Sequence, residues 1–182
     1  MKKMAVLFTD IVGSSKFFKS HGNLAGREML RQHQVMTSPL IIEHGGSVVK
    51  FLGDSVMAYF LSPKDAIRAA VKIQQAFQRY NYKKEQEKQI HIRLCIHYGD
   101  GIIEEKDIFG NVVNIAAKLL ALTDGDQIYI SQEVYDQVKD LFPDHFELAN
   151  ISDKKNILKG LTIFRVIWDE TTSFDPITKT IL

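Results

Sequence analysis

A near-continuous apolar run over residues 4–12 constrains the fold of this chain more than any other feature. Thr9 and Asp10 interrupt the run and Gly13-Ser14-Ser15 follow it, a pattern typical of a buried strand that ends in a turn. A carboxylate at the end of a buried strand destabilises the fold unless it gains a proton, a cationic partner or a metal ion. Asp10 is therefore the first candidate for a functional residue.

A second carboxylate, Asp54, follows Leu52-Gly53 between two short β-prone runs, residues 47–51 and 55–60. This pattern predicts a hairpin with Asp54 at or near its turn. Asp10 and Asp54 together suggest a paired metal site. Spacing alone leaves an alternative equally open, in which Asp10 is a helix N-cap and Asp54 an ordinary turn residue.

Apolar residues at helical spacing predict helices between these strands and after them. The first covers residues 24–44 and contains Pro39, which is compatible with a kink. The second follows Ser62, an N-cap with proline at the next position. Two more helices are expected, over residues 110–120 and, after a cap, over residues 131–141.

The remaining β-prone segments alternate with these helices. They lie at residues 90–98, 102–108, 126–130, 146–148 and 158–168. Gly99-Asp100-Gly101 is expected to be the turn of a second hairpin, between the first two of these segments. Because hairpins are interspersed with helices, the expected fold class is α+β with a mainly antiparallel sheet.

The composition limits the possible partners and the compartment. The 182 residues are 45% hydrophobic, enough for one packed domain over residues 1–182 with a core over about 4–168 and a short C-terminal tail. Lysine and arginine number 23 against 22 acidic residues, which argues against a nucleic-acid or anionic-membrane surface. The one cysteine, Cys95, is expected in the core, and no apolar run approaches the roughly 20 residues of a membrane span. We expect a soluble, cytoplasmic protein.

The residue types at the end of the first strand fit a metal ion and a phosphate group. Asp10 and Asp54 offer hard oxygen ligands, which suit Mg²⁺ or Mn²⁺. Gly13, Ser14 and Ser15 can present backbone N–H groups to phosphate oxygens, because glycine permits close approach and a helix starts soon after. Metal and phosphate are therefore predicted to meet at one strand end.

Four sequence blocks occur in an order that resembles the catalytic domains of class III nucleotidyl cyclases. They are Phe8-Thr9-Asp10-Ile11-Val12-Gly13-Ser14-Ser15, Lys50-Phe51-Leu52-Gly53-Asp54, Ile96-His97-Tyr98-Gly99 and residues 107–118. The resemblance implies a dimeric cyclase fold with a ferredoxin-like βαββαβ core. It also implies two Mg²⁺ or Mn²⁺ ions per site, held by Asp10, Asp54 and the backbone carbonyl of Ile11. The implied reaction is attack of the ribose 3′-oxygen on the α-phosphorus of a nucleoside triphosphate, with release of pyrophosphate.

The resemblance assigns Lys50 and Asp107 to recognition of the base. Lysine only donates hydrogen bonds and suits N1 of adenine, an acceptor, whereas the guanylyl cyclases of the family have glutamate at this position. Asp107 can accept a hydrogen bond from the adenine 6-amino group. Together the two residues imply ATP rather than GTP, although each residue taken alone is also of a type common at protein surfaces.

Asn114 and Lys118 lie four residues apart and so share one face of the expected helix. The resemblance implies that Asn114 orients the ribose and that Lys118 stabilises the charged transition state. The family usually has arginine where Lys118 stands, and lysine lacks the planar bidentate geometry of arginine, so a reduced turnover is expected. Lys159 resembles a late lysine that meets the terminal phosphates, with a plain surface lysine as the equally open alternative.

In the resembled family the metal-binding aspartates come from one protomer, and the base-reading and transition-state residues come from its partner. The resemblance therefore implies a homodimer with two shared sites, acting as an adenylyl cyclase on ATP. Two alternatives stay open: a guanylyl cyclase, and a degenerate cyclase-homology domain that dimerises or senses nucleotides with little activity. His97 is expected to be a packed strand histidine, and a separate regulatory protein is compatible with the sequence.

Overall fold

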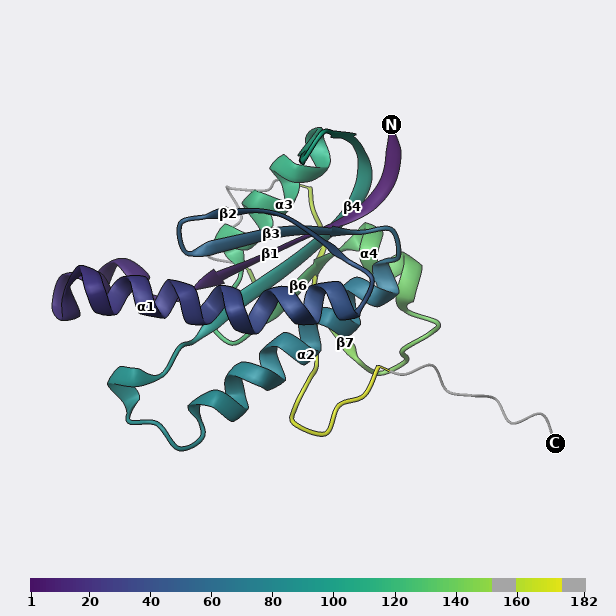
Figure 1. The fold of residues 1–182 in the computed structure, drawn as a ribbon. Helices are drawn as coiled ribbons and strands as arrows, with labels where there is room; N and C mark the ends of the chain where they lie inside the picture. The colour runs from purple at the N-terminus through teal and green to yellow at the C-terminus, as the bar shows by residue number, and fades with distance from the viewer. Residues whose placement is uncertain (152–159, 175–182) are drawn as a thin grey trace.

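The computed structural model describes residues 1–151 and 160–174, which form a sheet with helices on both faces (Figure 1). The strands are β1 (Lys2–Ile11), β2 (Ser47–Leu52), β3 (Ser55–Phe60), β4 (Ile92–Glu104), β5 (Asp107–Phe109), β6 (Ile128–Ser131), β7 (Phe146–Leu148) and β8 (Ile163–Val166). The helices are α1 (Ser14–Glu43), α2 (Pro63–Asn81), α3 (Asn111–Leu122) and α4 (Gln132–Val138), with a short 3₁₀ turn, η1 (Gln86–Lys88).

The sheet order is β2-β3-β1-β4-β6-β8-β7, and β5 pairs with the end of β4. Its pairs are antiparallel except β4 with β6, which run parallel. Apart from η1, the chain begins β1-α1-β2-β3-α2-β4 and places these strands in the order β2-β3-β1-β4, which is the ferredoxin-like arrangement. The expected α+β fold with a mainly antiparallel sheet is therefore confirmed.

The central position of β1 explains its nearly unbroken apolar sequence. Helices α1, α2 and α4 cover one face of the sheet and α3 covers the other, so β1 is buried on both sides. Ala5, Leu7 and Ile11 pack toward α1 and α2, whereas Val6 and Phe8 pack toward α3. This alternation places Asp10 on the α3 side of the sheet, because successive side chains of a strand point to opposite faces.

Helix α1 begins at Ser14, not near residue 24 as the apolar spacing predicts. Gly13 precedes it with φ 74°, a left-handed conformation that glycine adopts without strain. The helix is broken at Gly22, with φ 83° and ψ 173°, so its first turns form a separate segment that the periodicity did not reveal. Because Gly13 occupies the N-cap position, the alternative in which Asp10 caps this helix is wrong.

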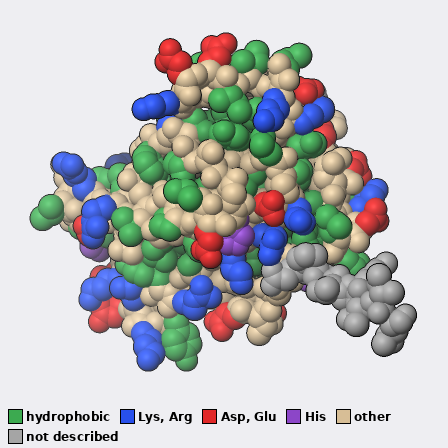
Figure 2. All heavy atoms as spheres, turned by 45° about the vertical axis from the view of Figure 1, so that its right-hand side comes forward, with side chains coloured by type: hydrophobic (Ala, Val, Ile, Leu, Met, Phe, Trp, Pro, Cys, Tyr) green, Lys and Arg blue, Asp and Glu red, His purple; other side chains and the backbone are tan. Residues whose placement is uncertain are grey.

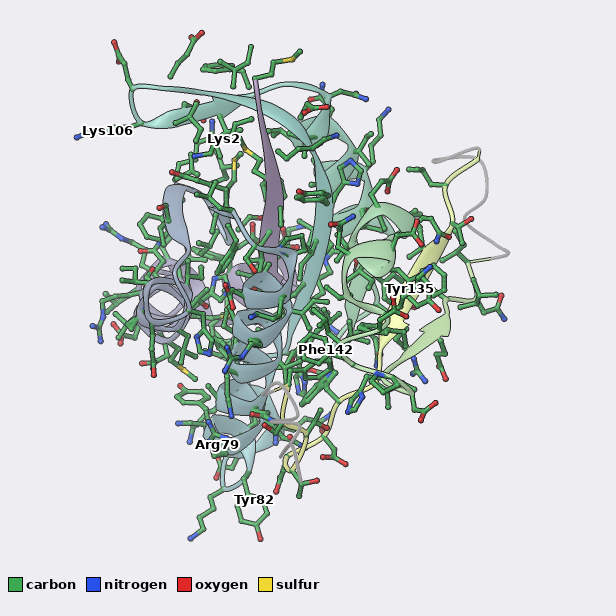
Figure 3. All side chains as sticks on the ribbon, turned by 90° about the vertical axis from the view of Figure 1, so that its right-hand side faces the viewer. Lys2, Arg79, Tyr82, Lys106, Tyr135 and Phe142 are labelled. Atoms are coloured by element: carbon green, nitrogen blue, oxygen red, sulfur yellow. The ribbon has the colours of Figure 1, made fainter. Side chains whose placement is uncertain are left out.

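Strand β4 runs straight through residues 99–101, so the hairpin turn expected there is wrong. These residues pair with β1, with Gly99 opposite Met4 and Gly101 opposite Lys2. A Cβ at Gly101 would lie 2.8 Å from the sulfur of Met4, so glycine serves close packing here and not a turn. The chain turns instead at Glu105 (φ 52°) and Lys106, and Figure 3 shows Lys106 at the tip of this arm, pointing away from the protein.

Two capping predictions had opposite outcomes. The Ser62 hydroxyl accepts a hydrogen bond from the backbone N–H of Asp65, which confirms the N-cap of α2. Ser131 precedes α4, but its side chain makes no cap and instead bonds Nδ1 of His97 at 2.8 Å. His97 is buried, as is Cys95, so both residues are packed in the sheet as expected.

The surface carries charges of both signs. Figure 2 shows lysine, arginine, aspartate and glutamate side chains intermixed on the face in view. Within residues 1–151 and 160–174, no helix combines the length and apolar character that crossing a membrane requires.

Candidate active site

The carboxylate of Asp10 is held between the two strands that flank β1. The sheet register places Ser55 of β3 and Arg93 of β4 directly opposite it. The Ser55 hydroxyl donates to Oδ1 at 2.8 Å, while Nε and Nη2 of Arg93 donate to Oδ2 at 3.0 and 2.8 Å. Asp10 is only 7% exposed, so these neighbours replace most of its water.

Even with these partners, the charge of Asp10 is incompletely compensated. Burial raises the pKa of Asp10, and the hydrogen bonds from Arg93 and Ser55 offset this only in part. The nearby negative charge of Asp54 raises the Asp10 pKa further. The end of β1 and the β2–β3 turn thus bring two carboxylates close enough to repel each other, and carboxylate oxygens are ligands that suit Mg²⁺ or Mn²⁺.

Asp54 lies in the two-residue turn of the β2–β3 hairpin, after Gly53 with φ 63°. The Ser14 hydroxyl donates a hydrogen bond to its carboxylate. Since Ser14 is the first residue of α1, Asp54 lies beside the helix end where backbone N–H groups lack intrahelical partners. The structure thus brings Asp54 to the predicted phosphate-binding segment.

The predicted phosphate-binding residues form the entry to α1. A Cβ placed on Gly13 would meet no atom within 4 Å, so the segment is open to an incoming group. Ser15 is exposed, and the amides of Ser14 and Ser15 belong to the first turn of α1. This arrangement of free amides and helix dipole favours an anion.

The two predicted base-reading residues are in direct contact. Nζ of Lys50 donates to both carboxylate oxygens of Asp107, at 2.8 and 2.7 Å. These hydrogen bonds lower the pKa of Asp107. A cavity of about 220 Å³ opens beside the pair, between the β2–β3 hairpin and the β4–β5 arm, and Val49, Tyr59 and Ile108 are among its lining residues.

The predicted ribose and transition-state residues lie on the outer side of α3. Asn114 and Lys118 are both exposed and stand one helical turn apart, as their spacing predicts. In the described part of the chain, no hydrogen bond or ion pair joins them to Asp10 or Asp54. Lys159 lies outside the described residues.

Sequence reasoning missed Arg93, which donates two hydrogen bonds to the Asp10 carboxylate. Its signal was present, because a cation stands between Ile92 and Leu94 in an otherwise apolar strand. The partner was not evident, since Asp10 and Arg93 are 83 positions apart in the chain and are brought together by the β1–β4 register. His33, which bonds Thr9 at 3.1 Å next to Asp10, was also missed, because this contact arises from the packing of α1 on β1.

Comparisons with known proteins identify the family of this chain. The chain matches the adenylate and guanylate cyclase catalytic domain over residues 1–167. The putative adenylate cyclase 3 of Rhizobium meliloti is 29% identical over 88% of this chain, and an adenylate cyclase of Anabaena cylindrica is 27% identical over 87%. The matched part spans only 27% and 35% of those two proteins.

A solved structure shows the same fold. The adenylate/guanylate cyclase/hydrolase from Silicibacter pomeroyi superposes with a TM-score of 0.76 at 30% identity, covering 92% of this chain and 98% of that one. Sequence blocks, topology and the family match point the same way. The chain belongs to the class III adenylate and guanylate cyclase catalytic domains.

Proposed function

We propose that this chain is the catalytic domain of a homodimeric adenylyl cyclase that converts ATP to 3′,5′-cyclic AMP and pyrophosphate. The observation that carries the choice of ATP is the contact between Lys50 and Asp107. A group that only donates and a carboxylate that only accepts meet beside a cavity with a mixed polar and apolar lining. This pair of groups complements N1 and the 6-amino group of adenine. Guanine offers the reverse pattern at these positions.

The chain's oxygen ligands define the phosphoryl-transfer end of the site. Asp10, Asp54 and the Ile11 carbonyl are the groups that would hold the two ions. Bound there, Mg²⁺ or Mn²⁺ lowers the pKa of the ribose 3′-hydroxyl and neutralises triphosphate charge. The amides of the segment from Gly13 to Ser15 would bind phosphate oxygens at the helix end.

The remaining roles require a second copy of the chain. Asn114 would orient the ribose, Lys118 would stabilise the charge that develops in the transition state, and Lys159 would meet the terminal phosphates. Support for a dimer comes from exposed apolar residues of the β2–β3 hairpin and the β4–β5 arm, which flank the face of the sheet that α3 covers. They are Phe51 and Leu52 on the β2–β3 hairpin, each 47% exposed, and Ile102, Ile103 and Phe109 on the β4–β5 arm, 41%, 40% and 49% exposed.

The wider setting is part of the same proposal. We infer a single catalytic domain over residues 1–182, a cytoplasmic location and no nucleic-acid partner, supported by the near-balanced charge. A separate regulatory protein is compatible with this domain. Because the relatives are much longer than this chain, the substrates and partners of the whole protein belong to the proposal as well.

One observation favours a second candidate, a degenerate cyclase-homology domain with little activity. Lys118 keeps a positive charge but cannot bond a phosphate through two nitrogens as arginine does. The intact Asp10, Asp54, Lys50, Asp107 and Asn114 support the active enzyme instead.

The test is a direct assay of the purified chain with MnATP, MgATP and MnGTP, beside an Asp54→Ala control. Cyclic AMP from the wild type, little cyclic GMP and no product from the control are expected. If wild-type protein makes no more product than the control with either metal, the proposed cyclase activity is refuted. A preference for GTP would refute the proposed recognition of adenine.

A further inference from the structure

His33 lies inside the protein, where helix α1 passes over the end of β1. Its side chain is 1% exposed and its ring centroid lies 5.8 Å from that of Phe77 in α2. Nε2 of His33 and Oγ1 of Thr9 are 3.1 Å apart, and Thr9 is fully buried. A buried hydrogen bond of this kind fixes the distance between the two elements that it joins.

Thr9 lies close to the end of β1, one or two residues before the pairing of β1 with its two neighbouring strands ends. Asp10 opposite Ser55 is the last pairing between β1 and β3, and Ile11 opposite Ile92 is the last between β1 and β4. After Ile11 the chain turns through Gly13 into α1. One backbone hydrogen bond continues past this point, from the Val12 N–H to the His91 carbonyl at 2.8 Å, and side-chain contacts add to it in holding the end of β1.

Helix α1 makes one such contact to each of the two carboxylate-bearing segments. Ser14 bonds Asp54 of the hairpin, and His33 bonds Thr9 beside Asp10. Burial lowers the pKa of His33 to about 4, against the opposing effect of the Asp54 charge, so the imidazole is neutral near pH 7. A neutral ring adds no repulsion between the protein and a cation bound at the carboxylates.

We propose that His33 is a positioning residue of the metal site, acting through Thr9 on the spacing between Asp10 and Asp54. The inference rests on the proposed function in taking these two aspartates as the metal-binding pair. Divalent ions need their oxygen ligands within narrow distances, so a strand end that drifts relative to the hairpin weakens binding. A merely structural histidine would affect stability and leave metal affinity unchanged.

Three substitutions separate these roles. Thr9→Val removes the hydroxyl at constant shape, His33→Met keeps apolar bulk without the hydrogen bond, and His33→Gln keeps a polar group near the position of Nε2. Thr37→Val is the matched control, because Thr37 is buried one turn further along α1 and its Oγ1 has no hydrogen-bond partner in the described part of the chain.

The readout is Mn²⁺ binding, followed by the electron paramagnetic resonance signal of free Mn²⁺ in the presence of 3′-deoxy-ATP, which lacks the attacking hydroxyl. Thr9→Val and His33→Met should each weaken Mn²⁺ binding about tenfold, the double variant no more than either, with partial recovery in His33→Gln and no change in Thr37→Val. If His33→Met does not fold, Thr9→Val carries the test.

Wild-type affinity in Thr9→Val and His33→Met would overturn the proposal, as would a wild-type chain that binds no Mn²⁺. A wild type that binds Mn²⁺ but forms no cyclic AMP would instead overturn the proposed function alone. The two failures are thus distinguishable.

Discussion

The guanidinium of Arg93 donates two hydrogen bonds to a single oxygen of Asp10, through Nε at 3.0 Å and Nη2 at 2.8 Å. This cation lies on the carboxylate that the metal ion is expected to use. An incoming ion must therefore compete with the guanidinium, which once released remains next to any anion bound with the ion.

Replacing Arg93 separates these two effects. In Arg93→Met, Mn²⁺ alone should bind about tenfold more tightly because the competing charge is gone, while kcat/KM for MnATP falls about tenfold or more. Titration with Mn²⁺ without nucleotide, together with the cyclase assay, measures both. Arg31→Met, which removes an exposed arginine of α1, should change neither. Unchanged Mn²⁺ binding in Arg93→Met would refute the competition.

Exchanging Lys50 tests base recognition. Lys50→Glu should shift the ratio of kcat/KM for ATP over GTP by about 100-fold toward GTP, because glutamate accepts from guanine N1–H and can no longer pair with Asp107. Lys106→Glu makes the same charge change at an exposed residue on the tip of the β4–β5 arm (Figure 3) and should keep the ATP preference. A ratio that moves equally in both variants would show a general charge effect.

Replacing Lys118 on α3 with arginine, the residue usual in the family, tests how far lysine lowers turnover. Lys118→Arg should raise kcat about three- to tenfold without altering the preference for ATP, since a bidentate donor replaces a point charge. Steady-state kinetics with both nucleotides measure it. Equal or lower turnover would mean that the site is adapted to lysine.

The buried imidazole of His33 predicts a loss of stability in acid. Its ordinary pKa is about 6.5 in the unfolded chain and burial lowers the pKa to about 4 in the fold, so between these values only the unfolded chain takes up the proton. The contribution is complete above pH 6.5 and falls as the pH drops toward 4, by about 2 kcal/mol between pH 7.5 and pH 5.

Urea unfolding of wild type and His33→Gln at these two pH values isolates this contribution, because the depressed pKa of His97 is common to both proteins. The stability difference between the two proteins should narrow or reverse at the lower pH. A constant difference would contradict a neutral, buried His33.

Local chemistry made parts of the fold predictable. The β2–β3 hairpin with Gly53 in its turn and the cap by Ser62 depend on neighbours within a few residues, and both were predicted correctly. The prediction of a turn at Gly99 and Gly101 was wrong because glycine serves both turns and close packing. Only their pairing with β1, and the contact of Gly101 with Met4, distinguish the two uses. Gly22 likewise hid the first turns of α1.

The candidate site likewise contains residues that could be predicted from the sequence and residues that could not. Asp10, Asp54, Lys50 and Asp107 could be found because they stand in recognisable sequence blocks. Arg93 could not be matched to Asp10, since their contact depends on the register between two strands far apart in the chain. A contact that depends on long-range register leaves no local sign of the partner in the sequence, and the structure was needed to find it.

The central claim, a site completed across two copies of the chain, is tested by pairing two inactive variants. Asp54→Ala and Asn114→Ala protomers with different affinity tags, co-expressed and purified through both tags, form a heterodimer with one intact shared site. Each variant alone is expected to make no cyclic AMP, whereas the heterodimer should recover about half of the wild-type rate. A heterodimer as inactive as its parents would contradict it.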